Sequence, residues 1–219
     1  MSDSSMTGKS WSMTKFAAAL IALAVSLSLT PAVAQDQTPE PPTRKPLAPE
    51  RLVMPLFPAG WKEVYRDNGA VEVVEYLPAD QSVGSWQDKI LLQVYNDLND
   101  LPLDAIQRRM QGLNRNRCTG VIEGLLQSGL NNGYSSAFWT LGCRYLNNST
   151  GEGIGETQYT KAIQGETSLY VLSRIWRTAA FGQDGPALSA QTINDGVAFL
   201  TTAAVCVPNS GDHPCQPNQ

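Results

Sequence analysis

The sequence predicts an α+β fold: a mainly antiparallel sheet of about seven strands with two packed helices. The first observation is a long hairpin over residues 156–178, where apolar and aromatic residues alternate with a period of two. The second is an Asn68-Gly69 pair between two alternating segments, a combination typical of a tight hairpin. The third is a pair of segments, 102–117 and 189–205, in which apolar residues recur at helical spacing.

Two N-terminal segments precede the predicted single domain, which spans residues 52–219. Residues 1–34 have the pattern of a secretory signal peptide: Lys15 precedes an apolar run over 16–29, and Ala32-Val33-Ala34 forms a small-x-small cleavage site. A single-pass anchor is the alternative, but the run is short for a span of about 20 residues. Met13 is an alternative start. Residues 35–51 contain five prolines and no apolar periodicity, which predicts an extended linker.

After a loop over 55–60, segments 61–66 and 71–76 form a predicted hairpin with a type I′ turn at Asn68-Gly69. That register pairs an aromatic, an opposite-charge and a β-branched couple: Trp61 with Tyr76, Lys62 with Glu75, and Val64 with Val73. Residues 78–86 form a loop that folds Trp86 over the sheet edge. Residues 89–95 are apolar on both sides, which favours a central strand.

The first helix is predicted to begin near Pro102, with Asn99 or Asp100 as its cap. Its apolar stripe is Leu103, Ile106, Met110 and Leu113. Four arginines lie toward its C-terminal end, where positive charge suits the helix dipole: Arg108, Arg109, Arg115 and Arg117. They indicate either a solvated helix face or a polyanion site.

Segments 118–127 and 134–145 form a further hairpin, and centring its turn between Leu130 and Asn131 places Cys118 opposite Cys143. This pairing predicts a Cys118–Cys143 disulfide, which leaves Cys206 and Cys215 to join the C-terminal tail to the domain. Disulfides fit the oxidising compartment that a signal peptide implies. Asn148-Ser149-Thr150 matches the glycosylation sequon, a short and common motif.

The hairpin over 156–178 is followed by the second helix, which Ser189 caps and which runs to about Val205. Its predicted buried stripe is Ile193, Val197, Leu200 and Ala204, and Gly196 weakens it. The strand over 169–176 has an aliphatic face with Leu169, Val171 and Ile175. Its other face carries Tyr170, Arg174 and Trp176, which predicts either a ligand platform or a partly covered face with Arg174 reaching water.

Composition excludes one class of function. Removing residues 1–34 leaves 14 basic and 19 acidic residues, a net charge of −5. An acidic, exported domain lacks the basic footprint that nucleic-acid binding needs, so we expect no nucleic-acid partner. We also expect no transmembrane segment once the signal peptide is removed, and a periplasmic or secreted location.

The residues that carry common chemistries are poorly arranged. His213 is the sole histidine and lies in the tail, where a solvated role is expected. The cysteines are committed to disulfides, and GEGIGE over 151–156 is acidic and opens no helix, unlike a phosphate-binding loop. We therefore assign no catalytic residue, no metal ligand and no cofactor. Carboxylates are the remaining enzymatic option: Glu123, or the cluster of Asp97, Asp100 and Asp104.

Several short motifs carry a resemblance to known proteins across residues 55–205: PAGW (58–61), EYLP (75–78), Gln81, Trp86, QVY (93–95), KAIQG (161–165) and LYVLSRIWR (169–177). Together they resemble a group of uncharacterised secreted proteobacterial proteins whose layout is similar to the PsbP/Mog1-like α/β/α sandwich. These motifs are aromatic and turn residues, so the resemblance implies a fold and carries over no catalytic residue. It implies only the theme of a non-enzymatic binding or assembly module.

Two functional hypotheses follow. The first is an exported, non-enzymatic binding or assembly-accessory module whose partner is an envelope protein or a small ligand. Its candidate binding residues are Tyr170, Arg174 and Trp176, with Arg144 and Tyr159 nearby, since aromatic and arginine side chains are typical interface anchors. The alternative is a carboxylate-dependent hydrolase of envelope glycans or esters that uses Glu123 or the Asp97–Asp104 cluster.

Overall fold

The structure is a computed structural model that describes residues 49–147 and 153–215. The expected signal peptide, most of the expected linker and the Asn148-Ser149-Thr150 sequon lie outside these residues. The described residues form two helices, α1 (Leu103–Arg117) and α2 (Ala190–Thr202). They also form ten strands: β1 (Arg51–Val53), β2 (Trp61–Asn68), β3 (Val71–Pro78), β4 (Asp88–Asn96), β5 (Cys118–Glu123), β6 (Gln127–Asn131), β7 (Tyr134–Leu146), β8 (Ile154–Gln164), β9 (Ser168–Ala179) and β10 (Ala204–Cys206).

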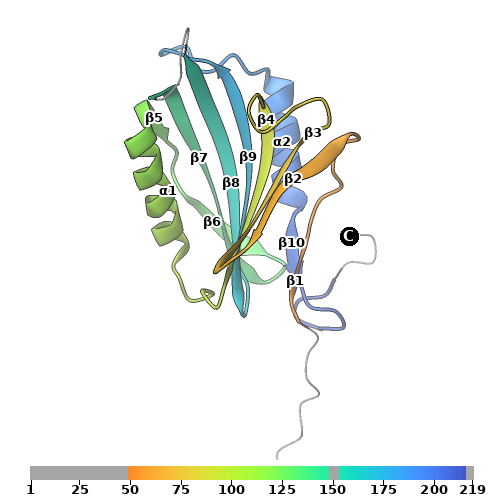
Figure 1. Cartoon of the computed structure of the whole chain (residues 1–219). Coiled ribbons are helices and arrows are strands. Elements are labelled where there is room, and N and C mark those ends of the chain that lie inside the picture. The colour runs from red at the N-terminus through yellow and green to blue at the C-terminus, as the bar shows by residue number, and fades with distance from the viewer. Residues whose placement is uncertain (1–48, 148–152, 216–219) are drawn as a thin grey trace, which may run out of the picture. The chain divides into compact units, whose positions relative to one another are not determined.

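Eight strands form one antiparallel sheet in the order β2-β3-β4-β9-β8-β7-β5, with β6 also paired to β7 (Figure 1). The hairpin of β8 and β9 lies in the middle of this sheet, as the alternation over 156–178 predicts. The strands β1 and β10 form a separate two-stranded sheet. The α+β class and the two helices are confirmed, whereas the strand number is ten and not about seven.

The additional strands have local causes. The predicted strand over 118–127 divides into β5 and β6 around Gly124, whose position lies so close to Thr140 that a Cβ would approach its Oγ1 to 2.2 Å. The segments before the first hairpin and after α2 each contribute a three-residue strand, β1 and β10. As a consequence α2 ends at Thr202, and Ala204, predicted in its buried stripe, belongs to β10.

Both helices cover the sheet, on opposite faces. Ile106 of α1 packs with one set of alternating side chains on β7 and β9, including Trp139, Leu169 and Val171. Phe199 and Leu200 of α2 pack with the other set, which includes Leu172 and Tyr170. The aliphatic face of β9 is therefore the floor beneath α1, and the face with Tyr170, Arg174 and Trp176 lies beneath α2.

The first hairpin exists, but its predicted register is wrong. Asn68 pairs with Glu72 and Trp61 with Pro78, with an irregularity between Glu63 and Tyr65. A type I′ turn needs positive φ at both central residues, and among the described residues neither Asn68 nor Gly69 has it. Instead the Asp67 carboxylate accepts a hydrogen bond from the Gly69 N–H at 3.1 Å, which closes a different turn.

The hairpin of β5, β6 and β7 turns at Asn132-Gly133, where φ is 50° and 85°. The predicted turn centre is therefore wrong, and Cys143 faces Val121. The Cys118–Cys143 disulfide is nevertheless confirmed, because the two Cα atoms lie 5.4 Å apart across neighbouring strands. The Cys206–Cys215 disulfide is also confirmed.

Two smaller expectations at the helix and tail ends are wrong. Pro102 occupies the N-cap of α1 without a side-chain hydrogen bond, because Asn99 instead donates to the Glu166 carbonyl at 2.5 Å. His213 is not a solvated tail residue, because the tail folds back between Cys206 and Cys215. Its ring stacks on Tyr134 with centroids 3.9 Å apart, and its Nδ1 lies 2.8 Å from the Asn132 carbonyl oxygen.

Candidate binding cavity over Arg174

The three candidate residues of β9 lie beneath α2 and are almost fully buried. Tyr170 and Arg174 are each 8 % exposed, and Trp176 is 3 % exposed. Their alternation puts them on one face, as the sequence predicts, but α2 and the chain before β2 cover that face. Arg174 consequently does not reach bulk water through its side chain.

Gly196 allows α2 to approach the sheet at Trp176. A Cβ at this position would lie 2.4 Å from Cη2 of Trp176, well inside any normal contact distance. The glycine that weakens the helix by propensity is thus required by the packing. The buried indole N–H of Trp176 has no hydrogen-bond partner among the described residues, so the ring serves as an apolar surface here.

Asp88 neutralises Arg174. The Nε and Nη2 atoms of Arg174 donate to the two carboxylate oxygens of Asp88 at 3.2 Å and 2.8 Å, a bidentate geometry. Asp88 begins β4 and pairs with Trp176 in register, which brings its side chain diagonally next to Arg174 on the same face. The chain thereby holds a nearly buried ion pair in the centre of the sheet.

Aromatic rings surround the guanidinium of Arg174. Its central carbon lies 5.4 Å from the ring centres of both Trp61 and Trp176 and 6.0 Å from that of Phe199. These distances fit cation–π contacts, which gain strength when the cation is removed from water. The rings come from β2, β9 and α2, so Arg174 joins three elements.

The loop before β4 is fixed by Gln81. Its side-chain oxygen accepts hydrogen bonds from the backbone N–H groups of Gln87 and Asp88, at 2.7 Å and 3.1 Å. The contact sets the start of β4, and with it the position of the Asp88 carboxylate. Trp86 is buried with Leu77 of β3 and Ile175 of β9, so it packs over interior strands and not over the sheet edge as predicted.

A cavity of about 850 Å³ opens above the ion pair. Asp88 and Arg174 line it together with Trp61 and Gln81. Its remaining walls are the chain before β2, the end of β3 and one side of α2: Val53, Met54, Pro55, Leu56, Pro58, Pro78, Asp195, Ala198, Phe199 and Thr202. The lining is mainly apolar, with a few polar groups at one place, which is the usual composition of a small-molecule site.

The chain before β2 is tied to the hairpin of β8 and β9. The Glu50 carboxylate accepts hydrogen bonds from the N–H groups of Glu166, Thr167 and Ser168, at 2.5, 3.1 and 3.0 Å. Tyr170 donates its hydroxyl to the same carboxylate at 3.4 Å. Glu50 lies in the expected linker, so the wall of the cavity is anchored by a residue that no sequence pattern singles out.

The five residues selected from the sequence thus have different positions. Arg174 lines the cavity, whereas Trp176 lies beneath it and Tyr170 helps to anchor its wall. Tyr159 packs edge-on against Trp176, with centroids 5.7 Å apart. Arg144 lies farther along β7 over Gly120, and its buried Nε has no hydrogen-bond partner within residues 49–147 and 153–215.

The sequence did not identify Asp88, Trp61 and Phe199 as partners of Arg174. Asp88 comes directly before the apolar strand over 89–95. A charged residue at the end of a central strand was the one sequence feature that could have marked Asp88 as a partner of Arg174. Its meaning depends on the pairing of β4 with β9, which are about 85 residues apart in the chain. Phe199 lies in α2 one residue from the predicted stripe.

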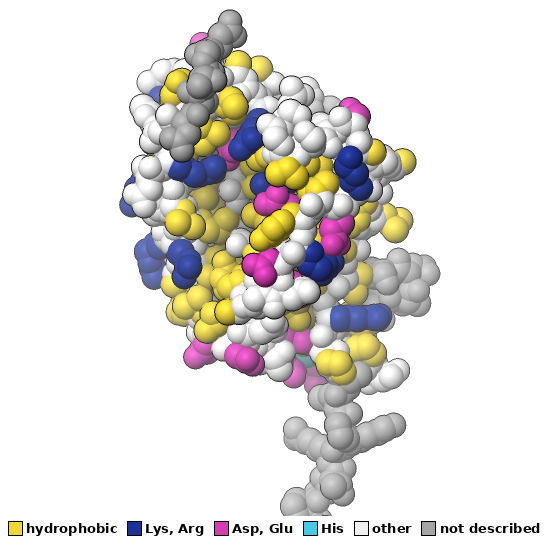
Figure 2. All heavy atoms as spheres, viewed as in Figure 1, with side chains coloured by type: hydrophobic (Ala, Val, Ile, Leu, Met, Phe, Trp, Pro, Cys, Tyr) yellow, Lys and Arg dark blue, Asp and Glu magenta, His cyan; other side chains and the backbone are white. Residues whose placement is uncertain are grey.

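A second depression lies on the other face of the sheet, between α1 and strands β4, β8 and β9, and the sequence did not predict it. We call it the α1 groove; its volume is about 510 Å³. Figure 2 shows hydrophobic side chains in a hollow beside α1, with Lys and Arg side chains around it. Its lining residues are Trp86, Lys89, Leu91, Gln93, Tyr95, Arg109, Met110, Leu113, Asn114, Arg117, Leu141, Glu156, Gln158, Ile175 and Arg177.

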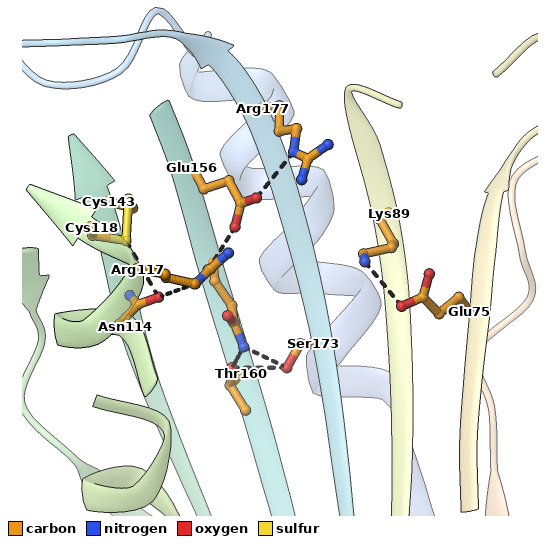
Figure 3. A network of polar contacts seen from close by, with 11 residues as sticks. Glu75, Lys89, Asn114, Arg117, Cys118, Cys143, Glu156, Thr160, Ser173 and Arg177 are labelled. Atoms are coloured by element: carbon orange, nitrogen blue, oxygen red, sulfur yellow. Dashed lines mark hydrogen bonds and ion pairs between the residues drawn. A yellow bond between two sulfur atoms is a disulfide. The ribbon is translucent and has the colours of Figure 1, made fainter. Parts of the chain in front are cut away.

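A polar network runs along one side of the α1 groove (Figure 3). The buried Glu156 carboxylate accepts from Arg117 at 2.7 Å and from Arg177 at 3.0 Å. Next to it on β8, Gln158 donates to the hydroxyls of Thr160 and Ser173 at 2.9 Å and 3.0 Å. These buried polar groups satisfy one another within the sheet.

Two carboxylates of the hydrolase hypothesis, Glu123 and Asp104, lie in surface ion pairs. Arg115 donates to both oxygens of Glu123, at 2.8 Å and 2.6 Å. Arg108 binds Asp104 at 2.5 Å, one turn away on α1. Within residues 49–147 and 153–215, no group of three or more His, Cys, Asp or Glu is arranged to hold a metal ion.

Comparisons with known proteins identify no relative: no protein-family model matches the chain, and no curated protein matches it. The two disulfides fit an oxidising environment. Neither helix of the described part of the chain has the length and apolar character needed to cross a membrane. The two depressions of the sheet are therefore the candidate binding sites.

Proposed function

We propose that this protein is an exported, non-enzymatic binding or assembly-accessory module whose ligand or partner segment occupies the cavity over Arg174. The observation that carries this proposal is the cavity itself. Its volume of about 850 Å³ falls within the range of roughly 300–1,000 Å³ that is typical of ligand sites. Its partner is a small ligand of the envelope or a segment of an envelope protein.

The chemistry of the lining supports a mainly apolar occupant. The cavity has one basic and two acidic lining residues: Arg174, Asp88 and Asp195. Arg174 and Asp88 neutralise each other, so they offer oriented polar groups rather than a net charge. Leu56 projects from the wall with 97 % of its surface exposed, an apolar contact that a bound partner would remove from water.

The export expectation and the resemblance agree with this role. Disulfides, the signal-like segment over 1–34 and an acidic net charge are typical of a periplasmic or secreted domain. Helices on both faces of an antiparallel sheet also fit the PsbP/Mog1-like α/β/α layout that the motifs suggest. We propose that the chain shares its fold with proteins of this PsbP/Mog1-like layout.

The hydrolase alternative has weaker support. A two-carboxylate mechanism needs one carboxyl group to give up a proton and a second to act as base or nucleophile. The cavity holds Asp88 and Asp195, but Arg174 engages both oxygens of Asp88. Asp88 is thereby committed to a structural pair, which favours binding over hydrolysis.

Site-specific photo-cross-linking tests the proposal. A photoreactive residue replaces Leu56 in the full chain, which is then irradiated in its own compartment. We expect a discrete adduct that disappears when Ala198→Trp fills the cavity from α2. Ala190→Trp, at the start of the same helix and outside the cavity lining, is the matched control and should retain the adduct. An adduct that survives Ala198→Trp unchanged would assign binding to another surface.

A further inference from the structure

The α1 groove differs from the cavity in its charge. Four of its lining residues are basic and one is acidic: Lys89, Arg109, Arg117 and Arg177 against Glu156. The chain as a whole has a formal net charge of −4, so this groove concentrates positive charge on an acidic protein. A low-dielectric cleft lined by one sign of charge attracts ligands of the opposite sign.

Most of these cations already have partners. Lys89 binds Glu75 at 3.1 Å, and Arg117 and Arg177 share Glu156. Arg109 has no ion-pair or hydrogen-bond partner within the described part of the chain. Arg109 and Tyr95 both line the groove. Burial raises the pKa of the Tyr95 hydroxyl, and the charge of Arg109 opposes that rise. One end of the groove therefore presents an uncompensated cation next to a phenol.

Beyond its charged residues, the groove is lined mainly by apolar side chains, with the polar side chains of Gln93, Asn114 and Gln158 among them, and it is elongated. Leu91, Leu141 and Ile175 from three strands form its floor, and Met110 and Leu113 of α1 form its side. Leu113 belongs to the predicted buried stripe of α1, yet 60 % of its surface is exposed. The groove follows β4 from Lys89 to Tyr95, six residues or roughly 20 Å of extended strand.

An aromatic side chain closes the end opposite Arg109. The Trp86 ring lies between two cations, with the Lys89 Nζ 4.5 Å and the Arg177 guanidinium carbon 3.8 Å from its centre. These contacts hold the ring in place at the strand ends. The groove is thus a channel with an apolar floor, an aromatic end and a cationic end.

The floor also limits what the occupant is. It is formed by β4, β9, β8 and β7, each of which is paired on both sides, so no free strand edge within the groove offers backbone hydrogen bonds to a peptide. The polar row of Gln158, Thr160 and Ser173 is bonded internally. An occupant gains little from backbone amide groups here and gains most from a long apolar body with one anionic group.

We propose that the α1 groove binds a single-chain anionic amphiphile of the long-chain fatty-acid class. Its carboxylate pairs with Arg109 beside Tyr95, and its alkyl chain lies along Leu91, Ile175 and Leu113 toward Trp86. This site is separate from the cavity over Arg174, and the proposal does not depend on the proposed function. It requires no chemical change in the ligand.

Calorimetric titration of the full chain tests this assignment, with dodecanoate as the probe at a concentration below micelle formation. We expect saturable binding of one dodecanoate per chain, weaker binding of octanoate, and no binding of dodecyltrimethylammonium, which has the same tail and the opposite charge. The two tail lengths test the apolar floor, and the two head groups test the cationic end.

Two pairs of variants locate the ligand. Arg109→Gln should weaken dodecanoate binding about threefold to fivefold, the range of one partly exposed ion pair. Arg108→Gln changes the neighbouring arginine, which binds Asp104 away from the groove, and should leave the affinity unchanged. Leu113→Asn should likewise weaken binding, whereas Leu130→Asn, which changes another exposed leucine on β6, should not. Unfolding midpoints check that all four variants remain folded.

Several results would overturn the proposal. These are equal binding of the cationic and anionic amphiphiles, unchanged affinity in both Arg109→Gln and Leu113→Asn, or no saturable dodecanoate binding at all. Tighter binding of a soluble acidic peptide, or self-association that Leu113→Asn abolishes, would assign the groove to a protein partner. None of these outcomes bears on the Leu56 cross-link, so the two proposals fail separately.

Discussion

The two faces of the central sheet are built from the same strands but differ in packing and charge. Under α2, Gly196 lies directly against Trp176, and the one arginine is neutralised by Asp88. Under α1, Leu113 remains exposed above a groove in which basic residues outnumber acidic ones. Both depressions have a mainly apolar lining, so charge balance rather than hydrophobicity distinguishes what each would hold.

The first way to break this comparison is to remove Arg174. Arg174→Met leaves the Asp88 carboxylate nearly buried without its partner, which should lower the free energy of unfolding by about 3 kcal/mol. The double variant Arg174→Met, Asp88→Leu should recover much of that loss, because the unpaired charge is gone. Urea denaturation measures both. A loss below about 0.5 kcal/mol, the value of an ordinary surface pair, would show that the ion pair is effectively solvated.

The second prediction concerns pH and the α2 face. Lys161 donates to the carbonyls of Thr201 and Ala203 at the end of α2, two bonds that a neutral amine can also make. Burial lowers the pKa of Lys161 from 10.5 to about 8. Between these values the unfolded chain binds more protons than the folded chain, so stability should increase as pH rises from about 8 to 10.

The control for this prediction is Lys161→Met, which should show a smaller increase in the same window. The full effect is at most about 3 kcal/mol, because one pKa unit corresponds to about 1.4 kcal/mol. Burial raises the pKa of Tyr134 and Tyr170 to about 12, which lowers stability above pH 10 in both proteins. The difference between the two urea series isolates Lys161. Identical pH profiles would mean that Lys161 keeps its ordinary pKa.

The third prediction compares one glycine in each helix. Gly196→Ala should destabilise the protein by about 1–3 kcal/mol, because the new methyl group would collide with Trp176. Gly112→Ala in α1 should stabilise it by about 0.5–1 kcal/mol, since a Cβ there meets no atom within 4 Å and alanine favours the helix. Thermal unfolding measures the signs. If both substitutions changed the stability in the same direction, the two helices would not differ in how closely they pack on the sheet.

The turns show why the sequence predicted the strands better than their registers. Two Asn-Gly pairs follow alternating segments, and only Asn132-Gly133 adopts the left-handed conformation of a type I′ turn. There the Asn132 amide donates to the Val205 carbonyl at 2.9 Å, a contact with a segment some 70 residues away. At Asn68-Gly69 the neighbouring Asp67 decides the turn locally. A short-range sequence pattern does not contain information on a long-range contact such as that between Asn132 and Val205.

The candidate site was predictable to a similar extent. Alternation along 169–176 was sufficient to select Arg174 and to put it on one face with Trp176. Its ion pair with Asp88 depends on which strands become neighbours, and the cavity wall depends on Glu50 in a segment that composition assigns to a linker. The α1 groove could not be predicted, because a helical stripe that includes Leu113 suggests complete burial.

The most direct test of the central claim, that the cavity over Arg174 is the binding site, combines both sites in one cross-linking measurement. A photoreactive residue at position 56 is irradiated in the native compartment, with and without excess dodecanoate. We expect one adduct that Ala198→Trp abolishes and dodecanoate does not displace. No adduct, or an adduct that is indifferent to Ala198→Trp, would contradict it.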